Sequence, residues 1–130
     1  MLVKNPAGGN EVIRTLAGDG ADKTMLIALN DRIADGRDIS WIWDVDFELL
    51  APRIDRVVCT GTRAAEMAMR LKYSGVPRDR IEVRPRLDDA IDRVSPPAGG
   101  TSYLLATYTA MLDLRAELVR RGWAQPYWET

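Results

Sequence analysis

The segment NDRIADGRDISWIWDVDFE, residues 30–48, crowds carboxylates and indoles into one short stretch. Its carboxylates include Asp35, Asp38, Asp44, Asp46 and Glu48, and its two indoles are Trp41 and Trp43. A carboxylate in a loop most often caps a turn or meets solvent, and Asp-Gly is itself a turn signal. Two indoles that alternate with Ile42 could point the same way and form a binding surface beside the carboxylates. The alternative is that both indoles fill the core beneath the loop.

The residue types that are missing from the sequence narrow the chemistry. There is no histidine, so the sequence contains no Ser-His-Asp or Cys-His arrangement of its own. With one cysteine and no histidine, zinc-site spacing is impossible, so no metal site is predicted. Cys59 follows an apolar run and has no base nearby, which favours a core position over a nucleophile. If this chain serves an enzyme, much of the machinery lies elsewhere.

Composition predicts an ordinary globular chain. The 130 residues suggest one domain over 1–130, and a net charge of −1 gives no reason to expect nucleic acid or an acidic membrane surface as a partner. No apolar run approaches the ~20 residues of a membrane helix, so no membrane insertion is expected. The single cysteine fits a reducing compartment, and the expected location is the cytoplasm.

Two other segments place polar groups at predicted strand ends. In TGTR, residues 60–63, Thr62 and Arg63 open a predicted helix, where backbone N–H groups suit an anion. The alternative is that Gly61 only permits a tight turn. Asn5 ends the first predicted strand, and there the alternative is a turn held by Pro6.

Short apolar runs alternate with helical patterns along the chain. Strands are predicted at 1–6, 24–30, 56–61, 80–85 and 101–108. Helices are predicted from an N-cap at Asn10 to Gly18, at 46–53, from an N-cap at Thr62 to Gly75 with Ala65, Met69 and Leu71 inside, at 87–94 and at 109–122. This order predicts an α/β fold: a mainly parallel, five- or six-stranded, Rossmann-like sheet with helices on both faces. Ligands of such sheets meet the loops at the carboxyl ends of the strands, and segment 30–48 leaves one of those ends.

Three stretches resemble one known family. VKNPAG at 3–8, LNDRIADGRDISWIWDVDFE at 29–48 and VCTGTRAAEMAMRLK at 58–72 are together similar to the C-terminal domain of MurT, the Mur-ligase-like subunit of lipid II isoglutaminyl synthase. The resemblance covers essentially the whole chain. It implies a domain of the Mur ligase C-terminal type, without the ATP-binding central domain, that belongs to a larger enzyme.

The resemblance also implies a partner and an activity. The whole enzyme pairs MurT with the glutaminase GatD, which releases ammonia from glutamine using a Cys and a His. The MurT part uses ATP and Mg to activate the α-carboxyl of D-glutamate in lipid II, and ammonia then gives D-isoglutamine in the peptidoglycan precursor. The domain alone is expected to bind no cofactor and to be inactive.

The family match assigns roles within the acidic segment. It implies that Asp38, the second aspartate of DGRD, supplies the acid that the glutaminase lacks, with Asp35 as the second choice. A carboxylate that accepts the Nδ1–H of a histidine fixes its tautomer and stabilises the imidazolium. Asp35, Trp41 and Trp43 are then candidates for contacts with the partner.

Other roles and other functions stay open. Asn5 and Arg63 match strand-end positions that face the nucleotide or the acceptor in Mur ligases. A second hypothesis is a non-catalytic Rossmann-like module that binds an anionic metabolite or nucleotide through Thr62 and Arg63. A third is an interaction domain without chemistry, in which only the tryptophans matter.

Overall fold

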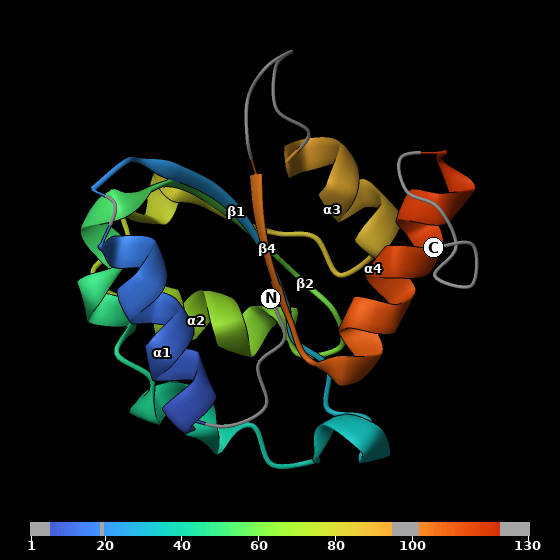
Figure 1. Ribbon diagram of the computed structural model, residues 1–130, viewed down its shortest axis with the longest axis horizontal. Helices are drawn as coiled ribbons and strands as arrows, with labels where there is room; N and C mark the ends of the chain where they lie inside the picture. Colours follow the sequence, from blue (N-terminus) through green and yellow to red (C-terminus); the bar gives the residue numbers. More distant parts are fainter. Residues whose placement is uncertain (1–5, 19, 95–101, 123–130) are drawn as a thin grey trace.

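The computed structural model describes residues 6–18, 20–94 and 102–122, which form an α/β domain around one parallel sheet (Figure 1). Its strands are β1 (Lys23–Ala28), β2 (Ile54–Thr60), β3 (Ile81–Val83) and β4 (Ser102–Ala106), in the order β3-β2-β1-β4. Every pairing is parallel, which confirms the predicted class. The predicted strand count was wrong: the described residues give four strands rather than five or six. The strand predicted at 1–6 lies outside them, apart from Pro6, which begins a helix.

Helices cover both faces of the sheet, as predicted. Helices α1 (Pro6–Ala17) and α2 (Ala64–Ser74) lie on one side, and α3 (Leu87–Val94) and α4 (Tyr108–Arg120) on the other (Figure 1). Successive strand residues point to opposite faces. In β1, Met25 and Ile27 therefore join the core beneath α1 and α2, whereas Leu26 joins the core beneath α3 and α4.

The acidic segment leaves the carboxyl end of β1, as predicted, and crosses to β2 through four 3-10 turns. These turns are η1 (Ile33–Asp35), η2 (Ser40–Asp44), η3 (Phe47–Leu49) and η4 (Ala51–Arg53). The single helix predicted at 46–53 is thus two short turns. Pro52 lies in the second of them, and because proline has no N–H it cannot donate to a continuous α-helical ladder.

The predicted N-cap of the first helix was wrong. The helix begins at Pro6, because proline suits the first helical position, where its missing N–H would be unpaired anyway. Asn10 therefore lies inside α1, and its side chain reaches the acidic segment. Its Oδ1 accepts the N–H of Asp46 at 2.6 Å, and its Nδ2 donates to the carbonyl of Asp44 at 3.4 Å. Asn10 thus fastens the segment to α1.

The buried face of α2 differs from the prediction except at Leu71, which is buried as predicted. Ala65 and Met69 are exposed, while Met67, Leu71 and the charged Arg70 are buried. The core stripe includes Met67, Leu71 and Ser74, at the three- and four-residue spacing of one helix face. Placing Met69 inside took the wrong phase of this period. The helix ends as predicted at Gly75, which is left-handed with φ 109°.

Candidate functional site

Asp38 lies exposed in the turn between η1 and η2. Its Oδ1 accepts the backbone N–H of Ser40 at 2.9 Å. This hydrogen bond to the backbone of Ser40 lowers the pKa of Asp38 below its ordinary value of 3.8, so the side chain is a carboxylate at neutral pH. Among the described residues, Ser40 is its only hydrogen-bonding partner. Within the described residues the carboxylate is held by Ser40 alone, through its backbone and its side chain, and it is otherwise exposed to solvent.

Asp35, the second choice for the same role, is engaged inside the domain. Its Oδ1 accepts the backbone N–H of Thr109 at 2.6 Å, and its Oδ2 accepts the hydroxyl of Thr109 at 2.5 Å. The same Oδ2 accepts the backbone N–H of Arg32 at 3.2 Å. Asp35 thus caps the first turn of α4 and ties η1 to it. With both of its oxygens occupied, Asp35 holds the loop that carries Asp38, and Asp38 is the more exposed of the two carboxylates.

Removing this cap should loosen the loop without unfolding the domain. We expect Asp35→Ala to lower the free energy of unfolding by about 1 kcal/mol, the usual cost of losing an N-terminal helix cap. Urea unfolding followed by circular dichroism measures it. Asp46→Ala is the matched control, because the Asp46 side chain is exposed and has no hydrogen bond within the described residues. Equal stability of the two variants would contradict the capping role.

A buried asparagine joins three strand ends beneath the loop. Asn30 follows β1 and is 3 % exposed. Its Oδ1 accepts the N–H of Thr62 at 2.9 Å, its Nδ2 donates to Thr109 Oγ1 at 3.0 Å, and its backbone N–H donates to Thr107 Oγ1 at 3.0 Å. One side chain and its amide thus link the carboxyl ends of β1, β2 and β4. We did not predict this role for Asn30, although a polar residue that ends an apolar run was a usable signal.

The tight turn after β2 brings the backbone at Gly61 close to Asn30. Gly61 has a positive φ of 96°, and a Cβ there would lie 2.5 Å from the carbonyl oxygen of Leu29 and 2.6 Å from Asn30 Oδ1. No other residue fits without displacing that backbone. The alternative interpretation of TGTR, a glycine needed for a close turn, is therefore the one the geometry favours.

The groups predicted to hold an anion at TGTR are already bonded within the chain. The N–H of Thr62 goes to Asn30, and its hydroxyl donates to Asp31 Oδ1 at 3.0 Å. The Arg63 guanidinium lies 3.3 Å from Asp31 and 3.0 Å from Glu66, and so sits between two carboxylates. Arg63 is the N-cap residue of α2, and its side chain makes no capping hydrogen bond. The prediction of Thr62 as the N-cap was therefore wrong. The anion-binding hypothesis gains no support from this arrangement.

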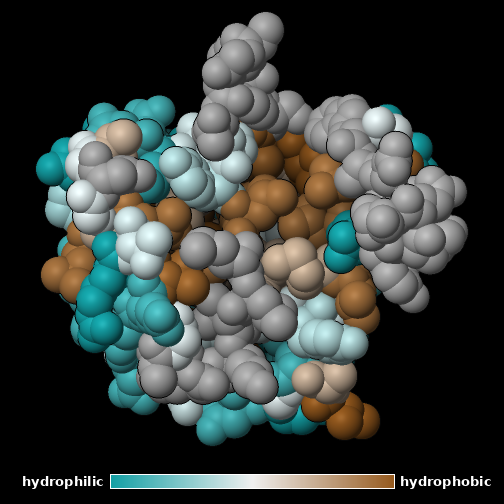
Figure 2. All heavy atoms as spheres, viewed as in Figure 1, coloured by the Kyte–Doolittle hydropathy of each residue, from teal (hydrophilic) through white to brown (hydrophobic). Residues whose placement is uncertain are grey.

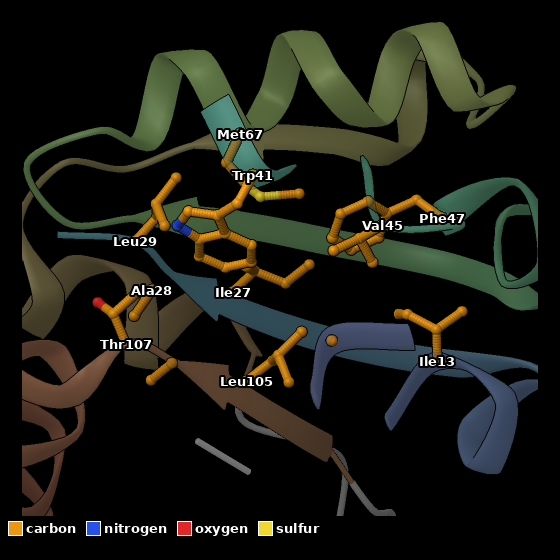
Figure 3. Close-up of a pocket in the computed structure, with 12 residues that line it drawn as sticks. Ile13, Ile27, Ala28, Leu29, Trp41, Val45, Phe47, Met67, Leu105 and Thr107 are labelled. Atoms are coloured by element: carbon orange, nitrogen blue, oxygen red, sulfur yellow. The ribbon is translucent and has the colours of Figure 1, made fainter. Parts of the chain in front are cut away.

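The two indoles do not point the same way. They lie in the 3-10 turn η2, where residues two apart are separated by about 240° around the axis. Trp41 is half-buried and directed toward Ile27 of β1 and Leu29, which follows that strand (Figure 3). Trp43 is 48 % exposed and meets the ring of Tyr73 edge-on at 5.7 Å. The two indoles therefore do not form one shared face: Trp41 packs against the core, and Trp43 faces outward.

The cavity beside Trp41 is too small for a substrate. Its volume is about 20 Å³, and its lining is almost wholly apolar, from α1, β1, η2, α2 and β4 (Figure 3). A space of this size admits about one water, and an apolar lining gives a water no partners. This cavity therefore offers no room for a substrate.

A buried arginine shapes the aromatic half of the segment. Arg70 of α2 is 3 % exposed, and it donates to the carbonyls of Ile42 at 2.8 Å and Val45 at 2.6 Å. It also makes two 2.9 Å hydrogen bonds to the carboxylate of Glu48, which lower the pKa of that side chain. Its guanidinium lies 5.3 Å from the Trp43 ring centroid. Sequence analysis missed Arg70; its place one turn from Met67 on an apolar stripe was the signal.

The remaining predictions have plain outcomes. Cys59 is buried, and burial raises the pKa of its thiol to about 12, which confirms a core position. Asn5 lies outside the described residues. No set of three potential metal-binding side chains comes together in the part of the chain that the structure describes. The helices described are all too short or too polar to cross a bilayer.

An all-parallel, doubly wound α/β domain with polar residues gathered at the carboxyl ends of its strands belongs to the class in which strand-end loops carry the function. Residues 2–111 match the MurT ligase C-terminal family, and the chain belongs to that family. The resemblance seen in the sequence is thereby confirmed.

Curated relatives agree with the family. The chain is 35 % identical, over 93 % of its length, to the lipid II isoglutaminyl synthase (glutamine-hydrolyzing) subunit MurT of Streptococcus pneumoniae, of which it covers 27 %. It is 47 % identical to the subunit of the same name from Staphylococcus aureus, over 58 % of this chain and 17 % of that protein. The chain therefore spans about a quarter of the length of the pneumococcal relative.

Proposed function

We propose that this domain docks a glutamine-hydrolysing partner subunit of the GatD type and supplies Asp38 to the partner's Cys-His pair. The observation that carries the proposal is the state of Asp38. It is exposed, ionised, held by one backbone N–H, and displayed on a loop that α1 and α4 fasten in place. The chain has no histidine for such an acid to serve, so the imidazole comes from the partner.

The chemistry of this split site follows from the carboxylate. Asp38 accepts the Nδ1–H of the partner's histidine, which leaves Nε2 free to take the proton of the cysteine thiol. The thiolate attacks the carboxamide carbon of glutamine, and the imidazolium returns the proton to the departing ammonia. Asp38 stabilises the imidazolium between these steps and itself keeps no proton.

The ligase half of the reaction belongs to the rest of the subunit. In the proposed whole enzyme, which we place in the cytoplasm, ATP and Mg activate the α-carboxyl of D-glutamate in lipid II, and ammonia from the partner converts it to D-isoglutamine. This domain covers 27 % of the pneumococcal relative. We assign nucleotide binding to the other part of the protein, because the N–H groups of Thr62 and Arg63 are hydrogen-bonded within the domain.

The test is reconstitution. A GatD-type glutaminase is titrated with the purified full-length protein, and glutamate release is measured together with co-elution in size-exclusion chromatography. We expect a stable pair and a rate of glutamine hydrolysis that rises to a plateau at one-to-one stoichiometry. A glutaminase that is equally active alone, or that never co-elutes, would remove the proposal. Binding of ATP by this domain by itself would instead favour the anion-binding module.

A further inference from the structure

Three apolar side chains stand exposed next to the loop that carries Asp38. Ile33 of η1 is 83 % exposed, and Tyr108 and Leu112 of α4 are 49 % and 51 % exposed. Tyr108 and Leu112 are four residues apart and so lie on one face of the helix. We call these three residues the η1–α4 patch. Apolar atoms stand out at the lower right of Figure 2, at the place that η1 has in Figure 1.

The patch is one surface because η1 is fastened to α4. Asp35 caps Thr109, and the guanidinium of Arg32 pairs with Asp113 at 3.0 Å. On the η1 side these two links flank Ile33, and on α4 they fall on Thr109 and Asp113, each of which directly follows a patch residue. Ile33 has most of its surface in water and lies on a turn that these links hold in place. A partner that covers such an exposed apolar patch gains binding free energy from its burial.

The short distance between the patch and Asp38 indicates which partner covers the patch. Asp38 follows Asp35 by three residues, so the two Cα atoms are at most about 11 Å apart. A standard interface covers about 800 Å² on each side, which is a disc of about 16 Å radius. A partner centred on Asp38 would therefore cover the turn that Asp35 fastens to α4, and the η1–α4 patch adjoins that turn.

A second group of exposed apolar residues sits on α2, where Met69 and Tyr73 are 54 % and 71 % exposed. It lies on the opposite face of the sheet from α4 (Figure 1). Trp43 already packs on Tyr73 and on Arg70, so the η2 side of the loop covers part of its own apolar surface. Among the described residues nothing covers Ile33 in this way, and it is 83 % exposed, which favours the η1–α4 patch as the docking surface.

We propose that the glutamine-hydrolysing partner subunit packs on the η1–α4 patch, and that this contact sets its histidine against Asp38. The inference rests on the proposed function and adds to it a binding surface distinct from the acid. Ile33 and Leu112 are the anchors, since each presents an aliphatic side chain with half or more of its surface in water.

The experiment separates binding from catalysis. The full-length protein carrying Ile33→Ser and Leu112→Ser is compared with one carrying Met69→Ser and Tyr73→Ser, by calorimetric titration with a GatD-type glutaminase. We expect the patch variant to raise Kd about 30-fold or more, as for loss of about 2 kcal/mol of binding free energy. The α2 variant should bind as the unchanged protein does. Since all four residues are exposed, thermal unfolding should show that both variants fold.

The outcomes distinguish this inference from the proposed role of Asp38. At saturating glutaminase the patch variant should recover most of the activity, whereas a variant without the Asp38 carboxylate should bind normally and stay inactive. An unchanged Kd in the patch variant, or a larger loss of affinity in the α2 variant, would contradict the proposed docking surface. It would not affect the proposed role of Asp38. Full activity without the Asp38 carboxylate, together with lost binding in the patch variant, would support the docking surface and contradict the proposed role of Asp38.

Discussion

Asp38→Asn should lower the glutaminase rate of the assembled pair by about 10⁴-fold, the loss found when a triad carboxylate becomes an amide. The reason is geometric. The N–H of Ser40 holds one oxygen of the side chain at 2.9 Å, so the incoming amide keeps its oxygen there and turns its NH₂ toward the partner. An NH₂ group cannot accept the Nδ1–H of a histidine, and it favours the tautomer that cannot take the thiol proton. Glutamate release under saturating glutamine measures the loss.

The Asp38 variant needs a matched control and an independent measure of binding. Asp46→Asn changes an exposed carboxylate of the same segment that makes no side-chain hydrogen bond within the described residues, and it should leave the rate within about twofold. Co-elution of the Asp38→Asn protein with the glutaminase should be unchanged, because a single exposed side chain is altered. An unaltered rate in Asp38→Asn with normal binding would show that Asp38 is not the carboxylate that serves the partner's histidine.

Arg70→Ala should lower the free energy of unfolding by about 2–4 kcal/mol, mainly because two buried carbonyls lose their donor. The ion pair itself adds little, because the Glu48 side chain is 54 % exposed and is hydrated when it is unpaired. The substitution leaves the carbonyls of Ile42 and Val45 without their donor, and a buried acceptor without a partner costs about 1–3 kcal/mol. It also removes the cation beneath Trp43 and leaves a void under η2 and η3. Urea unfolding, monitored by tryptophan fluorescence, measures the change.

Arg86→Ala is the control for this substitution. The Arg86 side chain is 75 % exposed and pairs at the surface with Asp88, so its loss should cost less than about 1 kcal/mol.

The pH dependence of stability gives a second measurement of the Arg70–Glu48 pair. Because Arg70 lowers the pKa of Glu48, the pair contributes stability above the ordinary pKa of Glu48, 4.5, and this contribution is lost as the pH falls through the folded value. The stability difference between the unchanged protein and Arg70→Ala should therefore narrow in acid; a constant difference would contradict the pairing.

Local pattern was enough to predict most elements of this domain. Helix α3 has the predicted bounds, 87–94, because a short amphipathic run carries its own period. Strands β1, β2 and β4 lie within two residues of their predicted starts, because continuous apolar runs between turn signals are typical of strands covered on both faces. The alternation of these elements also predicted that the acidic segment leaves a strand at the carboxyl edge.

The distribution of roles within the candidate site depends on partners far apart in the chain. Asp35 and Asp38 are both aspartates of one short loop, and only the contact of Asp35 with Thr109, 74 positions away, separates a helix cap from a free acid. Asn30 and Thr107 are 77 positions apart. No local period carries such information, since a hydrogen bond depends on where two segments meet after folding.

The sequence by itself determined the α/β class, the family and the candidate acid, because each depends on residue types and their local order. The tertiary structure alone decided that Trp41 packs against the core while Trp43 faces outward, and that Arg70 supports the loop from beneath. It also decided that the N–H groups of Thr62 and Arg63 are hydrogen-bonded inside the domain. The physical reason is that burial and hydrogen bonding belong to pairs of segments. A side chain's neighbours are fixed only when the sheet brings separate strand ends to one edge.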